Sequence, residues 1–153
     1  MNRSRQVQML ALAGSAGLLM GALAFQYIGG MAPCALCIWQ RWPHGVALVA
    51  GLGLVLPGPW AALGALGAAG SGAIGVYHTG VERRWWEGPA SCTSGGDLSG
   101  LSAQQLLDQI LAAPVVRCDD VAWEMLGLSM ASWNAVLSFG LAALWLLSMR
   151  LRD

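Results

Sequence analysis

The chain has 153 residues, of which 56% are hydrophobic and only 10% are charged, and its eight arginines balance its eight acidic residues without any lysine. Its mean hydropathy is +0.57, whereas soluble domains carry roughly a quarter of charged residues. This composition excludes an ordinary soluble domain. A zero net charge without a basic cluster gives no indication of a nucleic-acid partner.

Four apolar segments are long enough to cross a bilayer, which takes about 20 residues for roughly 30 Å of hydrocarbon. They are residues 7–28, 38–56, 60–77 and 130–149. We therefore expect an all-α membrane protein, with a bundle of four transmembrane helices forming a single domain over residues 1–153. A cleaved signal peptide is the alternative for the first segment, but its apolar run of about 22 residues exceeds the roughly 7–15 of a signal peptide.

Glycine is frequent in the first and third segments, where Gly17 and Gly21 form a G-x-x-x-G motif. Small residues let membrane helices approach closely, so these glycines predict helix packing. The long connection over residues 80–129 is expected outside the membrane. It carries one predicted amphipathic helix, about residues 102–112, with Ser102 and Gln105 at capping-box spacing.

Arginines flank both ends of the chain, at positions 3, 5, 150 and 152. The positive-inside rule therefore predicts that both termini are cytoplasmic. With four spans, the turn at residues 29–36 and the loop at residues 80–129 face the opposite side of the membrane.

All four cysteines lie on that opposite side: Cys34, Cys37, Cys92 and Cys118. Disulfides persist outside the cytosol, and locality suggests the pairs 34–37 and 92–118, although four cysteines allow three connectivities. The C-x-x-C pair is typical of redox chemistry. The second pair suits a structural staple or disulfide exchange equally well. A zinc site is disfavoured, because the second pair is 26 positions apart and neither histidine lies in the loop.

Cys37 lies near the start of the second segment, where a helix N-terminus favours a thiolate. Arg41 follows one turn deeper, and an ionised group at membrane depth is a functional hypothesis by default. It is expected to stabilise the thiolate and to hold an anionic or carbonyl ligand, or else to reach the lipid head groups. His44 continues the same face and is expected to pack. His78 closes the third segment, with function and packing equally open.

A thiol pair needs an electron acceptor to turn over. The sequence has no G-x-G-x-x-G after a strand, no P-loop and no C-x-x-C-H, and its loop is too short for a flavin domain. A reactive C-x-x-C at the membrane boundary, beside a buried arginine, points to an acceptor dissolved in the bilayer. A quinone is the natural candidate.

The sequence PCALC at residues 33–37, followed by Gln40-Arg41, resembles the signature of the DsbB family, the bacterial disulfide bond formation proteins. The tripeptide at residues 77–79 and the segment at residues 118–133 resemble the same family. The similarity therefore extends from the first span to the fourth. Gln40 departs from the pattern, because an acidic residue is expected there in some relatives.

This resemblance implies a quinone-dependent thiol:disulfide oxidoreductase in the bacterial inner membrane, with its cysteines in the periplasm. Cys34 and Cys37 would be the pair next to the quinone, with Cys37 contacting the ring, Arg41 orienting a quinone carbonyl and His78 near the same pocket. The sequence does not distinguish ubiquinone from menaquinone.

The resemblance further implies that Cys92 and Cys118 take electrons from a periplasmic thioredoxin-fold oxidase of the DsbA kind. We expect Cys92 to be the sulfur that the partner attacks, because it lies in a Ser/Gly run whereas Cys118 is flanked by charged residues. Two alternatives stay open at this point. One is a quinone reductase of the vitamin K epoxide reductase type, and the other is a membrane scaffold whose disulfides only staple the loop.

Overall fold

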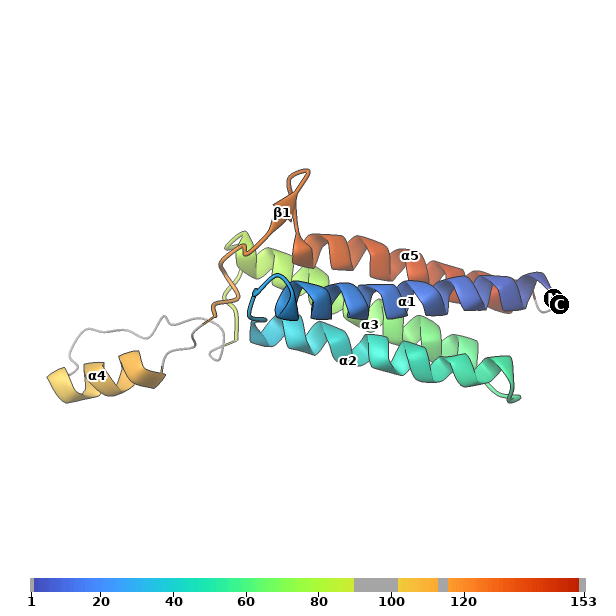
Figure 1. Ribbon diagram of the computed structural model, residues 1–153, viewed down its shortest axis with the longest axis horizontal. Helices are drawn as coiled ribbons and strands as arrows, with labels where there is room; N and C mark the ends of the chain where they lie inside the picture. Colours follow the sequence, from blue (N-terminus) through green and yellow to red (C-terminus); the bar gives the residue numbers. More distant parts are fainter. Residues whose placement is uncertain (1, 90–101, 113–115, 152–153) are drawn as a thin grey trace.

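The computed structural model of the chain describes residues 2–89, 102–112 and 116–151. In these residues the fold is helical apart from one short two-stranded antiparallel sheet (Figure 1). The elements in chain order are α1 (Arg3–Tyr27), α2 (Ala35–Val49), the 3-10 helix η1 (Ala50–Leu54), α3 (Trp60–Glu82), α4 (Ala103–Ala112), β1 (Glu124–Met125), β2 (Leu128–Ser129) and α5 (Met130–Arg150).

Four helices form the predicted all-α bundle. Helix α3 packs against α2 and α5, and α1 packs against the same two helices from the other side. Both termini lie at one end of the bundle, whereas α4 lies beyond the opposite end (Figure 1). The start of α2, the end of α3 and the start of α5 therefore meet at the end that carries the long connection.

Three helices of the described chain, α1, α3 and α5, are long and apolar enough to cross a membrane. The predicted second span, residues 38–56, is not a single α-helix in the structure, because α2 has 15 residues and ends at Val49. The chain continues as the tighter helix η1, which contains Gly51 and Gly53, and glycine weakens a helix interior by roughly 1 kcal/mol relative to alanine. The fourth crossing stays a prediction.

The other boundaries differ from expectation mainly at α3, which continues past Tyr77 to Glu82. The added turn is held because Val81 is buried and Glu82 accepts a hydrogen bond from the Ser129 hydroxyl. The capping box of α4 is confirmed. The Ser102 amide donates to Gln105 Oε1 at 2.9 Å, and the Gln105 amide donates to Ser102 Oγ at 3.3 Å.

A hairpin that the sequence analysis did not anticipate precedes α5. Its strands pair Glu124 with Ser129 and Met125 with Leu128. The two turn residues, Leu126 and Gly127, have φ of 55° and 75°, as a type I′ turn requires. Ser129 then accepts a hydrogen bond from the Ser132 amide at 3.2 Å and caps α5.

The glycines of α3 confirm the expected close packing. A Cβ on Gly67 would lie 2.6 Å from the Pro43 carbonyl oxygen of α2, and one on Gly75 would lie 3.0 Å from the Ala131 carbonyl oxygen of α5. Gly14 of α1 is packed as well, because a Cβ there would clash with Cδ2 of Leu141, but the expectation is wrong for Gly17 and Gly21. A Cβ on Gly17 or Gly21 would meet nothing within 4 Å, because this face of α1 borders a cavity.

Candidate active site

Cys34 and Cys37 lie in the first turn of α2, where the three-residue spacing brings their sulfur atoms together. Both are free thiols, with the two Sγ atoms 2.9 Å apart. Cys34 is the N-cap residue, and its Sγ accepts a hydrogen bond from the Cys37 amide at 3.2 Å. The hydrogen bond to Cys37, together with burial, raises the pKa of the Cys34 thiol. Cys34 therefore keeps its proton more readily than an ordinary cysteine thiol.

His78 of α3 lies directly behind this pair and is buried. Its Nε2 is 3.2 Å from the Cys118 carbonyl oxygen and 3.6 Å from Cys34 Sγ. Its Nδ1 is 2.9 Å from Gln40 Nε2. His78 therefore connects α2, α3 and the segment that precedes the hairpin.

Cys118 is fully buried and disulfide-bonded. Its Sγ, the Cys34 Sγ and a ring nitrogen of His78 all lie within 4.8 Å of one another. Such a trio has the composition of a metal site, but a disulfide sulfur is no thiolate and makes a poor ligand for zinc. The proximity is better suited to sulfur exchange. Cys92, the predicted partner of Cys118, lies outside the described residues.

A cavity of about 580 Å³ opens beside the cysteines between α1, α2 and α5. Its size falls within the roughly 300–1,000 Å³ typical of sites for small organic ligands. The predicted stripe of Cys37, Arg41 and His44 lines it, and His78 borders it as well. Apolar side chains complete the wall, among them Leu18, Ala22, Phe25, Val116, Met130 and Leu137.

Arg41 is the charged side chain that α2 contributes to this wall, and the other charged residues that line it are Glu82, Arg117 and Asp120. Its Nη1 donates to Gln26 Oε1 of α1 at 2.6 Å, whereas its buried Nε has no hydrogen-bond partner among the described residues. Arg41 also makes no ion pair with any described carboxylate. An apolar cavity with one unpartnered cationic donor fits a neutral ring that carries carbonyl oxygens, as a quinone does.

The sequence did not predict the contacts of three amide side chains, Gln26, Gln40 and Asn134. Gln26 holds Arg41, and Gln40 bonds His78 and also accepts from Asn134 of α5 at 2.8 Å. The available signal was their polarity inside apolar segments, since a polar group in hydrocarbon must find a partner. Their partners lie on other helices, so the pairing itself was not visible.

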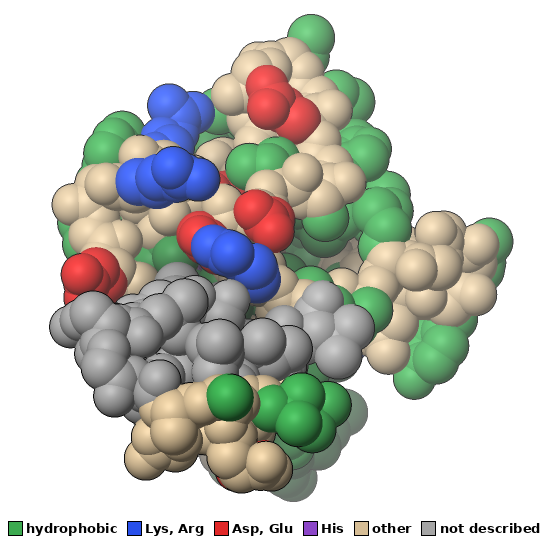
Figure 2. Space-filling model, turned by 90° about the vertical axis from the view of Figure 1, so that its left-hand side faces the viewer, with side chains coloured by type: hydrophobic (Ala, Val, Ile, Leu, Met, Phe, Trp, Pro, Cys, Tyr) green, Lys and Arg blue, Asp and Glu red, His purple; other side chains and the backbone are tan. Residues whose placement is uncertain are grey.

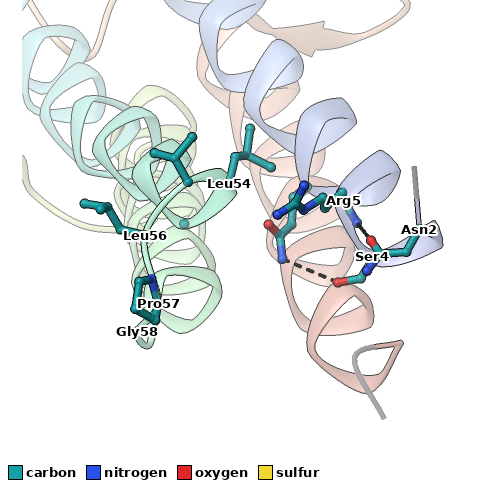
Figure 3. Close-up of a pocket in the computed structure, with 10 residues that line it drawn as sticks. Asn2, Ser4, Arg5, Leu54, Leu56, Pro57 and Gly58 are labelled. Atoms are coloured by element: carbon teal, nitrogen blue, oxygen red, sulfur yellow. Dashed lines mark hydrogen bonds between the residues drawn. The ribbon is translucent and has the colours of Figure 1, made fainter.

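A second, smaller cavity of about 300 Å³ lies at the end of the bundle that carries the termini. It is bordered by Arg5 and its neighbours in α1 and by residues 53–58 (Figure 3). Ser4 closes one side by donating to the Ser148 carbonyl oxygen at 2.8 Å. None of the described cysteines and histidines lines this cavity, which sets it apart from the cavity beside Cys34 and Cys37.

Charged side chains of both signs gather on the end face above the cysteines (Figure 2). Arg117 donates to both carboxylate oxygens of Asp119, with Nε–Oδ1 at 3.0 Å and Nη2–Oδ2 at 2.5 Å. This bond to Arg117 lowers the pKa of Asp119 below its usual value. Arg117 and Asp119 flank Cys118 in the sequence, so their polar side chains lie next to this buried residue.

Sulfur atoms of both predicted pairs thus lie within exchange reach of each other at the end of an apolar helix bundle. That combination defines a class, the membrane-embedded thiol–disulfide oxidoreductases. Residues 4–148 match the family described as Disulfide bond formation protein DsbB, and the chain belongs to this family. It is a multi-pass membrane protein and a disulfide-forming oxidoreductase.

Relatives named Disulfide bond formation protein B agree with this assignment. The one from Verminephrobacter eiseniae is 34% identical, covering 97% of this chain and 86% of the relative. The one from Stutzerimonas stutzeri is 31% identical, covering 97% and 96%. The one from Xanthomonas oryzae pv. oryzae is 37% identical, covering 92% and 86%. No solved structure gives a significant match. The matches favour this family over the vitamin K epoxide reductase type and over a scaffold.

Proposed function

We propose that this protein reoxidises a periplasmic thioredoxin-fold dithiol oxidase of the DsbA kind and passes the electrons to a quinone of the inner membrane. The observation that carries the proposal is the position of Cys34. Its Sγ lies 2.9 Å from Cys37 Sγ and within 4.8 Å of Cys118 Sγ. Cys34 can therefore receive electrons from the loop pair that contains Cys118 and bring them into its own pair with Cys37.

The electron path begins when a thiolate of the partner attacks Cys92 in the 92–118 disulfide and Cys118 leaves as a thiolate. The second thiol of the partner resolves this mixed disulfide, so the partner leaves oxidised with both loop cysteines reduced. Cys118 then attacks Cys34 of the oxidised 34–37 pair, and Cys37 leaves. Attack of Cys92 on Cys118 restores the loop disulfide and releases Cys34.

After these exchanges the 34–37 pair is a dithiol and the loop pair is a disulfide. A quinone in the cavity would supply an acceptor for two electrons and two protons. The Cys34–Cys37 pair gives up both electrons and both protons and forms its disulfide again.

The cavity residues support a quinone as the acceptor. Cys37 lines the cavity and faces its volume of about 580 Å³, and the unpartnered Nε of Arg41 offers a donor for a carbonyl oxygen. A role for His78 toward the quinone stays a prediction, because both of its ring nitrogens have protein contacts. Ubiquinone and menaquinone both have the required carbonyls.

Anaerobic turnover tests the proposal. Purified full-length protein is mixed with a reduced DsbA-like partner and a short-chain quinone, and the quinone absorbance is followed. We expect one quinone consumed per partner dithiol oxidised. The Cys34→Ser variant should still oxidise one equivalent of partner but consume no quinone. Partner oxidation without quinone consumption by the unmodified protein would overturn the proposal.

A further inference from the structure

His44 is a buried histidine of the cavity wall, 2% exposed, for which the proposed electron path has no use. Its Nε2 lies 3.2 Å from Asn134 Oδ1 and 3.1 Å from Ser138 Oγ, both on α5. Its Nδ1 is buried and has no hydrogen-bond partner among the described residues. A buried nitrogen without a partner is costly, which points to a ligand that supplies one.

The orientation of Asn134 follows from its neighbours. Its Nδ2 lies 3.4 Å from the Ser71 carbonyl oxygen and 2.8 Å from Gln40 Oε1. A backbone carbonyl only accepts hydrogen bonds, so the amide nitrogen must face it and Oδ1 must face His44. The orientation of Gln40 is fixed in the same way, because its Nε2 donates to the Leu36 carbonyl oxygen at 3.1 Å.

These two amides determine where each imidazole carries its proton. Asn134 Oδ1 is an acceptor, so His44 Nε2 must be the protonated nitrogen and Nδ1 the bare one. Gln40 Nε2 is a donor, so His78 Nδ1 must be bare, and its protonated Nε2 donates to the Cys118 carbonyl oxygen. His78 is thereby satisfied within the protein. His44 keeps one free acceptor.

We propose that Nδ1 of His44 accepts a hydrogen bond from a hydroxyl of the reduced quinone, with Asn134 as the residue that positions it. This inference rests on the proposed function. An oxidised quinone has carbonyl acceptors and nothing to donate, whereas the quinol has two hydroxyl donors. A bare imidazole nitrogen therefore selects the reduced form, and Arg41, with a donor, selects a carbonyl oxygen.

The spacing along α2 suits one ring held between the two side chains. Arg41 and His44 are three residues apart, which is about 4.5 Å along the helix axis, and Cys37 lies about 6 Å from Arg41 on the other side. All three line the same cavity. His44 thus favours binding of the quinol, the product of electron transfer, at the site where Cys37 delivers the electrons.

Equilibrium binding tests this selectivity separately from turnover. The full-length protein is kept with both cysteine pairs oxidised, so that the quinone finds no dithiol to oxidise. Reduction of the 34–37 disulfide by the quinol would run against the proposed direction of electron flow, and a thiol assay after the titration checks that it has not occurred. A short-chain benzoquinone and its quinol are titrated anaerobically by calorimetry. We expect His44→Phe to weaken quinol binding about three- to tenfold, the worth of one hydrogen bond, with little change for the quinone. The control Ser138→Ala removes a contact to the same imidazole but leaves Nδ1, and should keep the wild-type ratio of affinities.

A second variant keeps the inference testable if His44→Phe does not fold. In Asn134→Asp the carboxylate holds an additional proton on the imidazole, which turns Nδ1 into a donor. The preference should then move from the quinol toward the quinone. Equal weakening of both ligands in His44→Phe, or an unchanged preference in Asn134→Asp, would refute the role of His44 while leaving the proposed function intact. Failure of the unmodified protein to bind either ligand would refute both.

Discussion

Nη1 of Arg41 donates a hydrogen bond of 2.6 Å to Oε1 of Gln26, which ties α2 to α1 at the wall of the large cavity. Arg41 is the only charged residue between Gln6 and Gly80, and the alternative for it was an exposed contact with lipid head groups. The bond to Gln26 instead holds the guanidinium within the bundle, and the buried Nε has no hydrogen-bond partner among the described residues.

Arg41→Ala should therefore spare the fold and weaken quinone use. Loss of one charge-assisted hydrogen bond costs roughly 1.5–3 kcal/mol, so the apparent quinone affinity should fall about ten- to a hundredfold. The measurement is the KM for quinone at saturating partner. Gln26→Leu serves as a control, because it frees the guanidinium but keeps its charge, and should have a smaller effect. Unchanged quinone saturation in Arg41→Ala would make Arg41 a structural anchor.

The glycines of α1 give a second prediction, because Gly21 borders the cavity whereas Gly67 is pressed against α2. Gly21→Leu should fill part of the cavity and weaken quinone binding about tenfold, as expected from the cost of overpacking. Gly21→Ala should stabilise α1 by about 0.5–1 kcal/mol. Gly67→Ala should instead destabilise the protein by about 1–3 kcal/mol, since its Cβ would overlap the Pro43 carbonyl. Thermal unfolding and quinone titration distinguish the two positions.

The sequence predicted those parts of the site that depend on local spacing. Cys34, Cys37, Arg41 and His44 lie within one short stretch, so helical periodicity alone places the last three on one face, and all of them line the cavity. Helix ends that carry a capping side chain could likewise be predicted from the sequence, as at Ser102. The end of α2 could not be predicted, because apolar residues continue beyond Val49 and hydropathy does not distinguish an α-helix from a 3-10 helix.

What the sequence did not predict depends on which helices become neighbours. The bond between Gln40 and Asn134 joins residues 94 positions apart, and nothing near either residue indicates the other. The prediction of close packing failed at Gly17 and Gly21 for the same reason. Gly21 and Gly67 look alike in sequence, but one faces a cavity and the other a packed helix, and only the arrangement of the bundle decides between them.

The surface above Cys118 should lose stability in acid. The pKa of Asp119 lies below its ordinary value of 3.8, because Arg117 donates hydrogen bonds to its carboxylate. A depressed pKa means that the stabilisation is present above the ordinary value and disappears as the pH falls through the folded-state pKa. We expect a small decrease in the unfolding temperature below pH about 4. Asp119→Asn should remove this part of the pH dependence and Asp120→Asn should not; equal profiles for both variants would contradict the assignment.

Membrane orientation is a separate prediction, supported by the arginines at both chain ends and by the two termini lying at one end of the bundle (Figure 1). Reporter fusions after Gly30 and Gly96 should report the periplasm, and a fusion after Gly58 should report the cytoplasm. The Gly58 fusion also tests whether α2 with η1 crosses the membrane. A cytoplasmic signal from Gly96 would overturn the orientation and the oxidising role together.

The last prediction concerns the sulfur at which the partner enters, which we expect to be Cys92. Cys118 is fully buried, so a thiolate carried by another protein cannot reach it without movement of the surrounding residues. Exchange proceeds through a mixed disulfide, and its site depends on which sulfur is accessible. Cys92 lies in a run of serine and glycine, outside the described residues.

The charges next to Cys118 have two opposite effects on whether the partner attacks Cys92 or Cys118. The carboxylates of Asp119 and Asp120 repel an incoming thiolate, which disfavours direct attack on Cys118, but they also make Cys118 a poorer leaving group when Cys92 is attacked. Arg117 offsets part of both effects, since it pairs with Asp119. Access decides between the two sulfurs, because a thiolate carried by another protein does not reach the buried Cys118.

A partner that lacks its second cysteine should therefore become trapped on this protein through Cys92. Peptide mapping of the trapped complex identifies the linked sulfur directly. Cys92→Ser should abolish trapping. Cys118→Ser leaves Cys92 as a free thiol, which should form the same link only when the single cysteine of the partner carries a small thiol as a mixed disulfide, because that small thiol then leaves. Trapping through Cys118, or trapping that survives Cys92→Ser, would mean that electrons enter at another sulfur and that the buried surface around Cys118 opens when the partner binds.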